Sequence, residues 1–244
     1  MEHKVALITG AARRVGAEVA RILHSKGMNV ILHCRHSLSE AETICRDLNK
    51  LRADSAKIIQ ADLHNIGEID RLAGEARKYW NRLDLLVNNA SSFYETPVGK
   101  VTVEQWDELL GSNLKAPFFL SQAAMPALKE TKGCIVNIVD IHAERPLVDF
   151  PVYSIAKAGL VAMTRSLAIE LGPEIRVNGI APGAILWPEH GMTEGKKEEM
   201  LSRIPLARKG AEKDIAETVA FLALGAGYIS GQIIAVDGGR SVCA

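Results

Sequence analysis

The sequence predicts an α/β fold, namely a single Rossmann-type, doubly wound domain with a seven-stranded parallel sheet and helices on both faces. Short apolar segments alternate with longer segments in which apolar residues recur every three or four positions. Such alternation is typical of strands and crossover helices around a parallel sheet. The 244 residues contain no repeat or linker, so residues 1–244 are expected to form one domain.

Seven short, mostly apolar segments are the expected strands, because a strand buried on both faces is apolar throughout. They are Lys4–Thr9, Asn29–His33, Lys57–Gln60, Leu83–Asn88, Cys134–Val139, Arg176–Ala181 and Ile233–Val236. The expected helices are Ala17–Lys26, Ser39–Leu51, Ile66–Tyr79, Val103–Leu128, Val152–Leu171 and Lys213–Leu224. Residues 184–203 lack a clear period, and we expect them to form a mobile substrate flap.

Composition excludes several classes of function. The 29 Lys and Arg residues balance 29 Asp and Glu residues, which argues against nucleic acid or an anionic membrane as a partner. No apolar run approaches the roughly 18 residues of a membrane span, and the N-terminus lacks the pattern of a signal peptide. We therefore expect a cytoplasmic location. The four cysteines are far apart and indicate neither a disulfide framework nor a metal site.

The first strand runs into a glycine-containing turn, Thr9–Gly16, that leads to a helix. Backbone N–H groups at such a helix start bind the pyrophosphate of a dinucleotide, and glycine permits the close approach. An ordinary tight connection is the alternative. The segment after the second strand has no acidic residue to bind a ribose hydroxyl, and Arg35, His36 and Ser37 offer donors instead. This favours NADP over NAD, unless these residues are only solvated loop charges.

Two further patterns indicate a site. Asp62 follows the third strand, where it either contacts the adenine side of the cofactor or caps the next helix. Tyr153 precedes Lys157 by four residues at a helix start, so both side chains share one face. A nearby ammonium favours the phenolate, which would bring the pKa of Tyr153 towards neutrality, and Lys157 is also placed to bind the nicotinamide ribose. Without the other motifs, Tyr153 and Lys157 would more simply be two neighbouring side chains on the protein surface.

Taken together, several segments resemble the short-chain dehydrogenase/reductase family over almost the whole chain. They are Thr9–Gly16, Asn88–Ala90, Asn113, Tyr153 with Lys157, Arg176–Asn178, and Pro182 with Gly183. The resemblance implies a nicotinamide cofactor, catalysis by an Asn-Ser-Tyr-Lys set and a homotetramer. It places the NADP(H) site at Gly10, Arg13, Arg14, Val15, His33, Arg35, His36, Ser37, Asp62, Leu63, Asn89, Ala90, Ser91, Lys157, Pro182 and Gly183. Asn113, Tyr153 and Lys157 match three catalytic positions.

The fourth catalytic position, usually a serine, is Asp140. An ionised carboxylate only accepts hydrogen bonds and would repel the oxyanion that forms when a carbonyl is reduced. A substrate that presents N–H groups and gains a proton on nitrogen suits Asp140 better, and pterins are of that type. The chain also resembles the pteridine reductases in its 9–14 turn, its 88–94 stretch and the spacing of Asp140, Tyr153 and Lys157.

That resemblance implies a pterin slot formed by Arg14, Ser91, Phe93, Asp140 and Tyr153. Phe93 would stack on the flat pterin, whereas its alternative is a core residue after the fourth strand. Hydride would pass from NADPH to a pterin ring carbon while Tyr153 protonates the adjacent nitrogen, helped by Asp140 and Lys157, and Asn113 would hold a water relay. Dihydrobiopterin, dihydromonapterin and dihydrofolate remain open as substrates.

Two other functions stay open. One is a general NADPH-dependent carbonyl or 3-oxoacyl-thioester reductase, for which a serine at position 140 would be expected. The other is a catalytically inactive NADP-binding sensor, which need not keep Asn113, Tyr153 and Lys157 together. Cys34–Ser37 and Cys243 depart from the pteridine reductase pattern. Trp187, His190 and Met192 of the flap are expected to shape the substrate site, and residues 103–128 and 152–171 to pair between subunits.

Overall fold

The computed structural model describes residues 3–185 and 193–243. Its seven parallel strands form one sheet in the order β3-β2-β1-β4-β5-β6-β7. This confirms the predicted fold class, and each predicted strand is present to within two residues at either end. The strands are β1 Val5–Ile8, β2 Asn29–Cys34, β3 Ala56–Gln60, β4 Leu85–Asn88, β5 Cys134–Ile138, β6 Arg176–Pro182 and β7 Ile233–Val236. Strand order reverses between β1 and β4, the switch point at which open sheets of this kind bind ligands.

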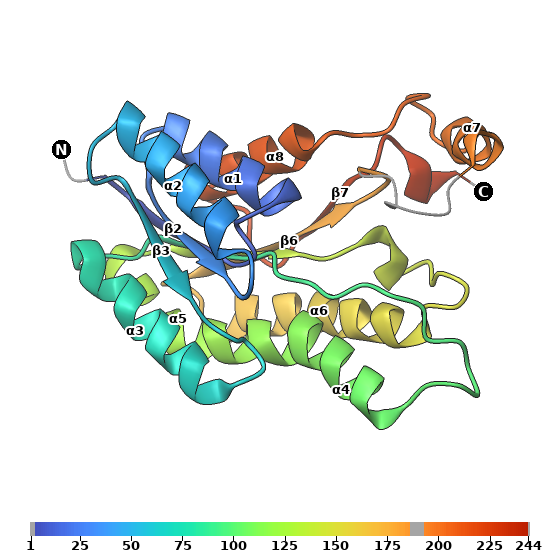
Figure 1. Ribbon diagram of the computed structural model, residues 1–244, viewed down its shortest axis with the longest axis horizontal. Coiled ribbons are helices and arrows are strands. Elements are labelled where there is room, and N and C mark those ends of the chain that lie inside the picture. The colour runs from blue at the N-terminus through green and yellow to red at the C-terminus, as the bar shows by residue number, and fades with distance from the viewer. Residues whose placement is uncertain (1–2, 186–192, 244) are drawn as a thin grey trace.

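Helices cover both faces of the sheet (Figure 1). On one face lie α1 Arg14–Ser25, α2 Leu38–Leu51 and α8 Glu212–Leu224. The other carries α3 Ile66–Trp80, α4 Val103–Leu110, α5 Ala116–Thr131 and α6 Pro151–Glu170. Alternate residues of β1 enter the two cores, Ala6 and Ile8 on one side and Val5 and Leu7 on the other. Burial on both faces explains why the strands are uniformly apolar.

Among the described residues, α6 is the one helix that is long and apolar enough to cross a membrane. Half of its most apolar window is buried inside the protein, and the helix contacts β6 and the short 3-10 turn Ile141–Ala143. Its apolar composition is therefore accounted for by packing against the sheet.

The predicted single helix over residues 103–128 is wrong, because a π-helical segment, Gly111–Lys115, separates α4 from α5. The Asn113 side-chain amide donates to the carbonyl of Leu109 at 3.0 Å and so competes with the backbone for that acceptor. Pro117 has no N–H with which to continue the regular pattern at the start of α5. The widened turn buries Asn113, whose side chain bonds to Ser91 and Ser92 in the loop that follows β4.

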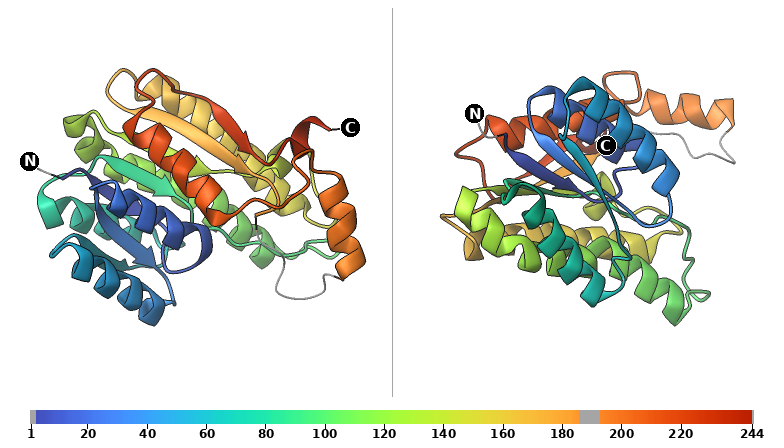
Figure 2. Two further views of the ribbon diagram at one scale, coloured as in Figure 1. Left: turned by 90° about the horizontal axis from the view of Figure 1, so that it is seen from above. Right: turned by 60° about the vertical axis from the view of Figure 1, so that its left-hand side comes forward.

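Part of the predicted flap, residues 184–203, is helical, which its lack of a clear apolar period did not predict. Residues 194–202 form α7, Glu194–Ser202, which lies beyond the carboxyl ends of the strands, near the C-terminus (Figure 2). Glu194 pairs with Lys197, and Glu199 with Arg203 at 2.6 Å, and this spacing supports a helix without an apolar stripe. The predicted flap residues Trp187, His190 and Met192 lie outside the described residues.

Candidate active site

A cavity of about 830 Å³ opens along the carboxyl edge of the sheet at the switch point between β1 and β4. The predicted site residues that line it are Gly10, Arg13, Arg14, Val15, His33, Arg35, Asp62, Leu63, Asn89, Ala90, Ser91, Phe93, Asp140 and Tyr153. The other predicted residues lie outside its lining, namely His36, Ser37, Asn113, Lys157, Pro182 and Gly183. The structure therefore brings two groups of predicted residues onto one cavity. We call the part around Arg13 and Arg35 the phosphate end and the part around Asp140 and Tyr153 the catalytic end.

The glycine-containing turn is held tightly to β4. Gly10 has a left-handed backbone, with φ of +62°. A Cβ on Gly16 would lie 2.3 Å from the carbonyl oxygen of Gly10, so this position accepts only glycine. Asn89 donates to the carbonyls of Thr9 and Gly10 at 2.8 and 3.2 Å, and the Thr9 hydroxyl accepts from the N–H of Ala90 at 2.9 Å. The turn is a fixed platform beside the cavity.

The start of α1 has the features of an anion site. Its N-cap residue, Arg13, makes no side-chain capping bond, and its first turn has no acidic residue. The positive end of the helix dipole is thus not neutralised by its own first turn, which fits the pyrophosphate of a dinucleotide. Arg14 adopts a left-handed φ of +51° in the turn, and the Arg13 guanidinium pairs with Glu40 through Nε at 2.9 Å.

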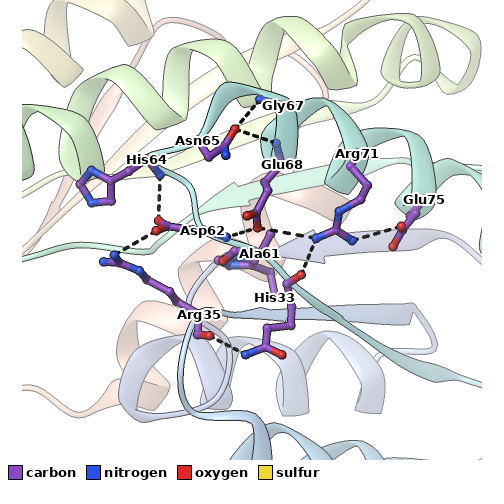
Figure 3. A network of polar contacts seen from close by, with 11 residues as sticks. His33, Arg35, Ala61, Asp62, His64, Asn65, Gly67, Glu68, Arg71 and Glu75 are labelled. Atoms are coloured by element: carbon purple, nitrogen blue, oxygen red, sulfur yellow. Dashed lines mark hydrogen bonds and ion pairs between the residues drawn. The ribbon is translucent and has the colours of Figure 1, made fainter.

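An ion pair stands at the phosphate end of the cavity (Figure 3). Arg35 and Asp62 are 2.9 Å apart, and the second carboxylate oxygen of Asp62 accepts from the His64 N–H at 3.0 Å. Although partial burial raises it, these partners lower the pKa of Asp62 overall. The helix-cap alternative for Asp62 is wrong, because Asn65 caps α3 by accepting from the N–H of Gly67 at 2.9 Å.

His33 lies beneath the glycine turn and uses both ring nitrogens. The Gly10 N–H donates to Nδ1 at 3.2 Å, and Nε2 lies 3.1 Å from the carbonyl of Ala61, which fixes the tautomer that carries hydrogen on Nε2. Burial lowers the pKa of His33 to about 4. The ring is therefore neutral at ordinary pH and supports the turn that it touches.

At the catalytic end, the hydroxyl of Tyr153 donates to Asp140 Oδ2 at 2.8 Å. Tyr153 is in the first turn of α6, and the other oxygen of Asp140 accepts from the His142 N–H at 2.9 Å. Burial, and then the charge of Asp140, raise the pKa of Tyr153 well above its usual value. The expectation that Lys157 brings this pKa towards neutrality is thus wrong, because a carboxylate rather than the ammonium contacts the phenol oxygen.

Lys157 lies one helical turn beyond Tyr153 and is almost fully buried. Its ammonium is 5.6 Å from the centre of the tyrosine ring and donates to the carbonyl of Ile138 at 2.9 Å. Burial lowers the pKa of Lys157 to about 8, although the charge of Asp140 opposes the shift. The pKa values of the phenol and the amine are thus shifted in opposite directions, because burial penalises the charged form of each group.

Asn113 connects the π-helical segment to the loop that follows β4. The Ser91 hydroxyl donates to its Oδ1 at 2.6 Å, and its Nδ2 donates to the carbonyl of Ser92 at 2.9 Å. The resulting link fixes the loop that carries Ser91 and Phe93 into the cavity wall. A water relay from Asn113 to Lys157 stays a prediction.

Phe93 has 52% of its surface exposed, so its alternative assignment to the core is wrong. Its ring stacks on Phe150, with centroids 4.5 Å apart and planes 12° apart. Sequence reasoning missed Phe150, although it directly precedes the helix that carries Tyr153. The other lining residues it left out of the site are Gly16, His64, Ser92, Tyr94, Glu95 and Ser112. Ser92 and Tyr94 fall inside the predicted 88–94 stretch, but no signal marks His64 or Ser112.

Comparison with known proteins agrees with this geometry. A family model described as enoyl-(acyl carrier protein) reductase matches residues 10–241. Pteridine reductase 1 of Leishmania tarentolae is 36% identical over 98% of this chain and 96% of its own. A 3-oxoacyl-(acyl-carrier-protein) reductase of Staphylococcus aureus is also 36% identical, over 97% of each chain. A crystal structure of a metagenomic blue fluorescent protein in complex with NADPH superposes with a TM-score of 0.91 at 32% identity, covering 97% of both chains. The chain therefore belongs to the short-chain dehydrogenase/reductase family, whose members use nicotinamide cofactors.

Proposed function

We propose that this protein is an NADPH-dependent reductase of a C=N bond in a pterin, with Tyr153 and Asp140 as its proton-donating pair. The observation that carries the proposal is the 2.8 Å bond from the Tyr153 hydroxyl to Asp140, where related enzymes usually have a serine. A carboxylate repels a developing oxyanion but accepts hydrogen bonds from N–H groups. A pterin presents such groups next to the ring nitrogen that must gain a proton.

NADPH supplies the hydride when it is bound. The uncapped start of α1 suits its pyrophosphate, and Arg13 and Arg35, with His36 and Ser37 of the same segment, suit its 2′-phosphate. Asp62 and Leu63 would contact the adenine. The remaining predicted contacts come from Gly10, Arg14, Val15, His33, Asn89, Ala90, Ser91, Lys157, Pro182 and Gly183.

Tyr153 acts as the acid in this proposal. Its raised pKa keeps the hydroxyl protonated at neutral pH, so a proton is available for the ring nitrogen. Once that proton leaves, the phenolate lies beside the negative charge of Asp140, and the buried ammonium of Lys157 compensates for it. Asn113 would hold the water through which Tyr153 regains its proton.

The cavity beside Tyr153 suits a flat ring. Phe93 offers an exposed aromatic ring there, and Arg14 and Ser91 line the same cavity. Offset stacking would hold a pterin between Phe93 and the nicotinamide. Dihydrobiopterin, dihydromonapterin and dihydrofolate all carry this ring, so they differ only in what the remainder of the cavity and the flap would contact.

A carbonyl or 3-oxoacyl-thioester reductase is the second candidate. Its support is the 36% identity to the staphylococcal enzyme, equal to that of the pteridine reductase. The two candidates differ in their requirement at position 140, because a serine hydroxyl serves carbonyl reduction better than a carboxylate does.

The test is NADPH oxidation by purified protein with each of the three pterins, a ketone panel and a 3-oxoacyl thioester. We expect turnover of a pterin, a fall of roughly 100-fold or more in Asp140→Ser, and no change in Asp47→Ser, an exposed control on α2. Turnover of ketones or thioesters without pterins would instead establish the second candidate. Absence of any turnover, together with intact NADPH binding, would favour an inactive sensor.

We also propose a cytoplasmic homotetramer. Trp106, Phe118 and Ile155 on α4, α5 and α6 are each at least 40% exposed, which suits pairing of these helices between subunits. The four cysteines are all free, as in a reducing compartment. Light scattering should give four times the 26.5 kDa mass of one chain, and a monomeric mass would contradict the assembly.

A further inference from the structure

Phe93 is held by an aromatic residue from a distant part of the chain. Its ring is nearly parallel to that of Phe150 at a centroid distance of 4.5 Å, and it contacts the edge or face of Tyr153 at 4.8 Å with planes 77° apart. About half of the Phe93 surface is nevertheless exposed, and all three rings line the same cavity. Phe150 thus covers part of Phe93 and leaves the rest open to a ligand.

The backbone fixes Phe150 more firmly than Phe93. The carbonyl of Phe150 accepts from the Ser154 N–H at 3.0 Å, which joins it to the first turn of α6. Its neighbour Asp149 has a left-handed φ of +64°. The backbone carbonyl of Asp149 accepts from the N–H of the fully buried Thr96 at 2.7 Å. This bond ties the turn before α6 to the loop that carries Phe93.

Phe93, in contrast, lies in a segment without regular secondary structure, Ala90–Glu95. Asn113 anchors the preceding carbonyl of Ser92, and the ring of Phe93 packs against the rings of Phe150 and Tyr153. An exposed ring on such a loop would lose rotational freedom on binding a ligand, whereas a ring already ordered by stacking does not.

We propose that Phe150 is a positioning residue that orders Phe93 as a stacking platform for a flat heteroaromatic substrate. It acts through Phe93 and not by contact with the reacting atoms. The substrate class rests on the proposed function, whereas the ordering of Phe93 does not. The opposite possibility, that Phe150 competes with the substrate for Phe93, predicts tighter substrate binding when Phe150 is removed.

The test is a double-mutant cycle with Phe93→Leu, Phe150→Leu and both together, in the presence of NADPH. We expect Phe150→Leu to raise the KM for the pterin roughly threefold to tenfold while kcat and NADPH affinity change little. If Phe150 acts through Phe93, it will add nothing to Phe93→Leu. Phe150→Tyr should restore the wild-type KM. As a control, Phe221 on α8 is as exposed as Phe93, and Phe221→Leu should leave the KM unchanged.

Additive effects, an unchanged KM or a lowered KM would each overturn the proposal. A crystal structure of Phe150→Leu with NADPH gives a readout that needs no turnover, because the Phe93 ring should then occupy more than one rotamer. A single, unaltered Phe93 rotamer would refute the inference even if the wild-type enzyme reduces no pterin, whereas that lack of pterin turnover would refute only the proposed function. If Phe150→Leu does not fold, the same comparison is made with Phe150→Met.

Discussion

The two ends of the cavity use charge in opposite ways. At the phosphate end, Arg13 and Arg35 are partly exposed, with side-chain exposures of 64% and 44%, and each rests on a carboxylate. At the catalytic end, Tyr153 and Lys157 are at most 5% exposed. Water screens the first pair of charges and leaves them free to exchange partners, whereas burial shifts the pKa values of the second pair. The first end is suited to recognising an anion and the second to transferring a proton.

Removing the Tyr153 hydroxyl should have the largest effect. We expect Tyr153→Phe to lower kcat roughly 100-fold to 10,000-fold, because the proton donor is lost, while the affinity for NADPH stays within twofold. Steady-state kinetics and a fluorescence titration with NADPH would measure both. Tyr228→Phe, at a fully exposed position, is the matched control. A Tyr153→Phe enzyme of undiminished kcat would remove the acid role from Tyr153.

The buried His33 should make the phosphate end sensitive to acid. Its pKa of about 4 in the folded state is below the ordinary 6.5, so the unfolded chain takes up the proton first as pH falls. The contribution of neutral His33 to the free energy of unfolding is complete above pH 6.5. It is lost towards pH 4, and the total loss is about 3 kcal/mol.

Urea unfolding at several pH values would measure this loss. We expect His33→Asn to be less stable at pH 7 but to lose less stability between pH 6.5 and 4.5 than the wild type. His142→Asn, whose ring contact is exposed, should keep the wild-type slope. Equal slopes in all three proteins would show that His33 is not the group that titrates.

Arg35 should affect cofactor choice but not chemistry. Loss of a charge-assisted contact to the 2′-phosphate in Arg35→Ala corresponds to about 2 kcal/mol, or roughly a 30-fold weaker Kd for NADPH. NADH binding and kcat at saturation should change little. The wild-type affinity for NADPH should also fall with added salt, while kcat should not. An equal loss for NADH and NADPH would place the phosphate site elsewhere.

The lowered pKa of Lys157 at the catalytic end should make kcat/KM depend on pH. Its pKa of about 8 is below the ordinary 10.5, so the ammonium is present below pH 8 and is lost as pH rises above it. Since Tyr153 stays protonated in that range, kcat/KM should fall about tenfold per pH unit above 8. A Lys157→Arg enzyme, which remains charged, should lack this limb, and a limb that persists would have to be assigned to another group.

The sequence predicted which residues lie at the two ends of the site but not the side-chain contacts that they make there. Gly10, Arg35, Tyr153 and Asp140 follow strands or start helices, so order along the chain placed them at one edge of the sheet. The raised pKa of Tyr153 was not predictable, because it depends on how deeply the phenol is buried and on which group, Asp140 or Lys157, contacts its oxygen. The break at residues 111–115 was also missed, since apolar periodicity continues across a π-helical turn.

The contact between Phe93 and Phe150 shows the same limit. Each residue is near a recognisable motif, but the stack joins positions that are far apart in sequence, and no local pattern encodes it. His64 is a second example, because its ring packs closely on Gly111, where an added Cβ would lie 2.7 Å from the His64 Nδ1. Contacts of this kind follow from the completed packing of loops, not from the identity of one segment.

Arg14, with its left-handed backbone at +51°, has a consequence for protein engineering. An L-residue in this conformation costs about 1 kcal/mol relative to glycine, so Arg14→Gly is an obvious stabilising change by backbone criteria alone. It would also delete a side chain that lines the cavity. With the role proposed for Arg14 in the pterin slot, thermostability and ligand binding compete at this position, and a screen that selects only for thermostability is expected to accept Arg14→Gly.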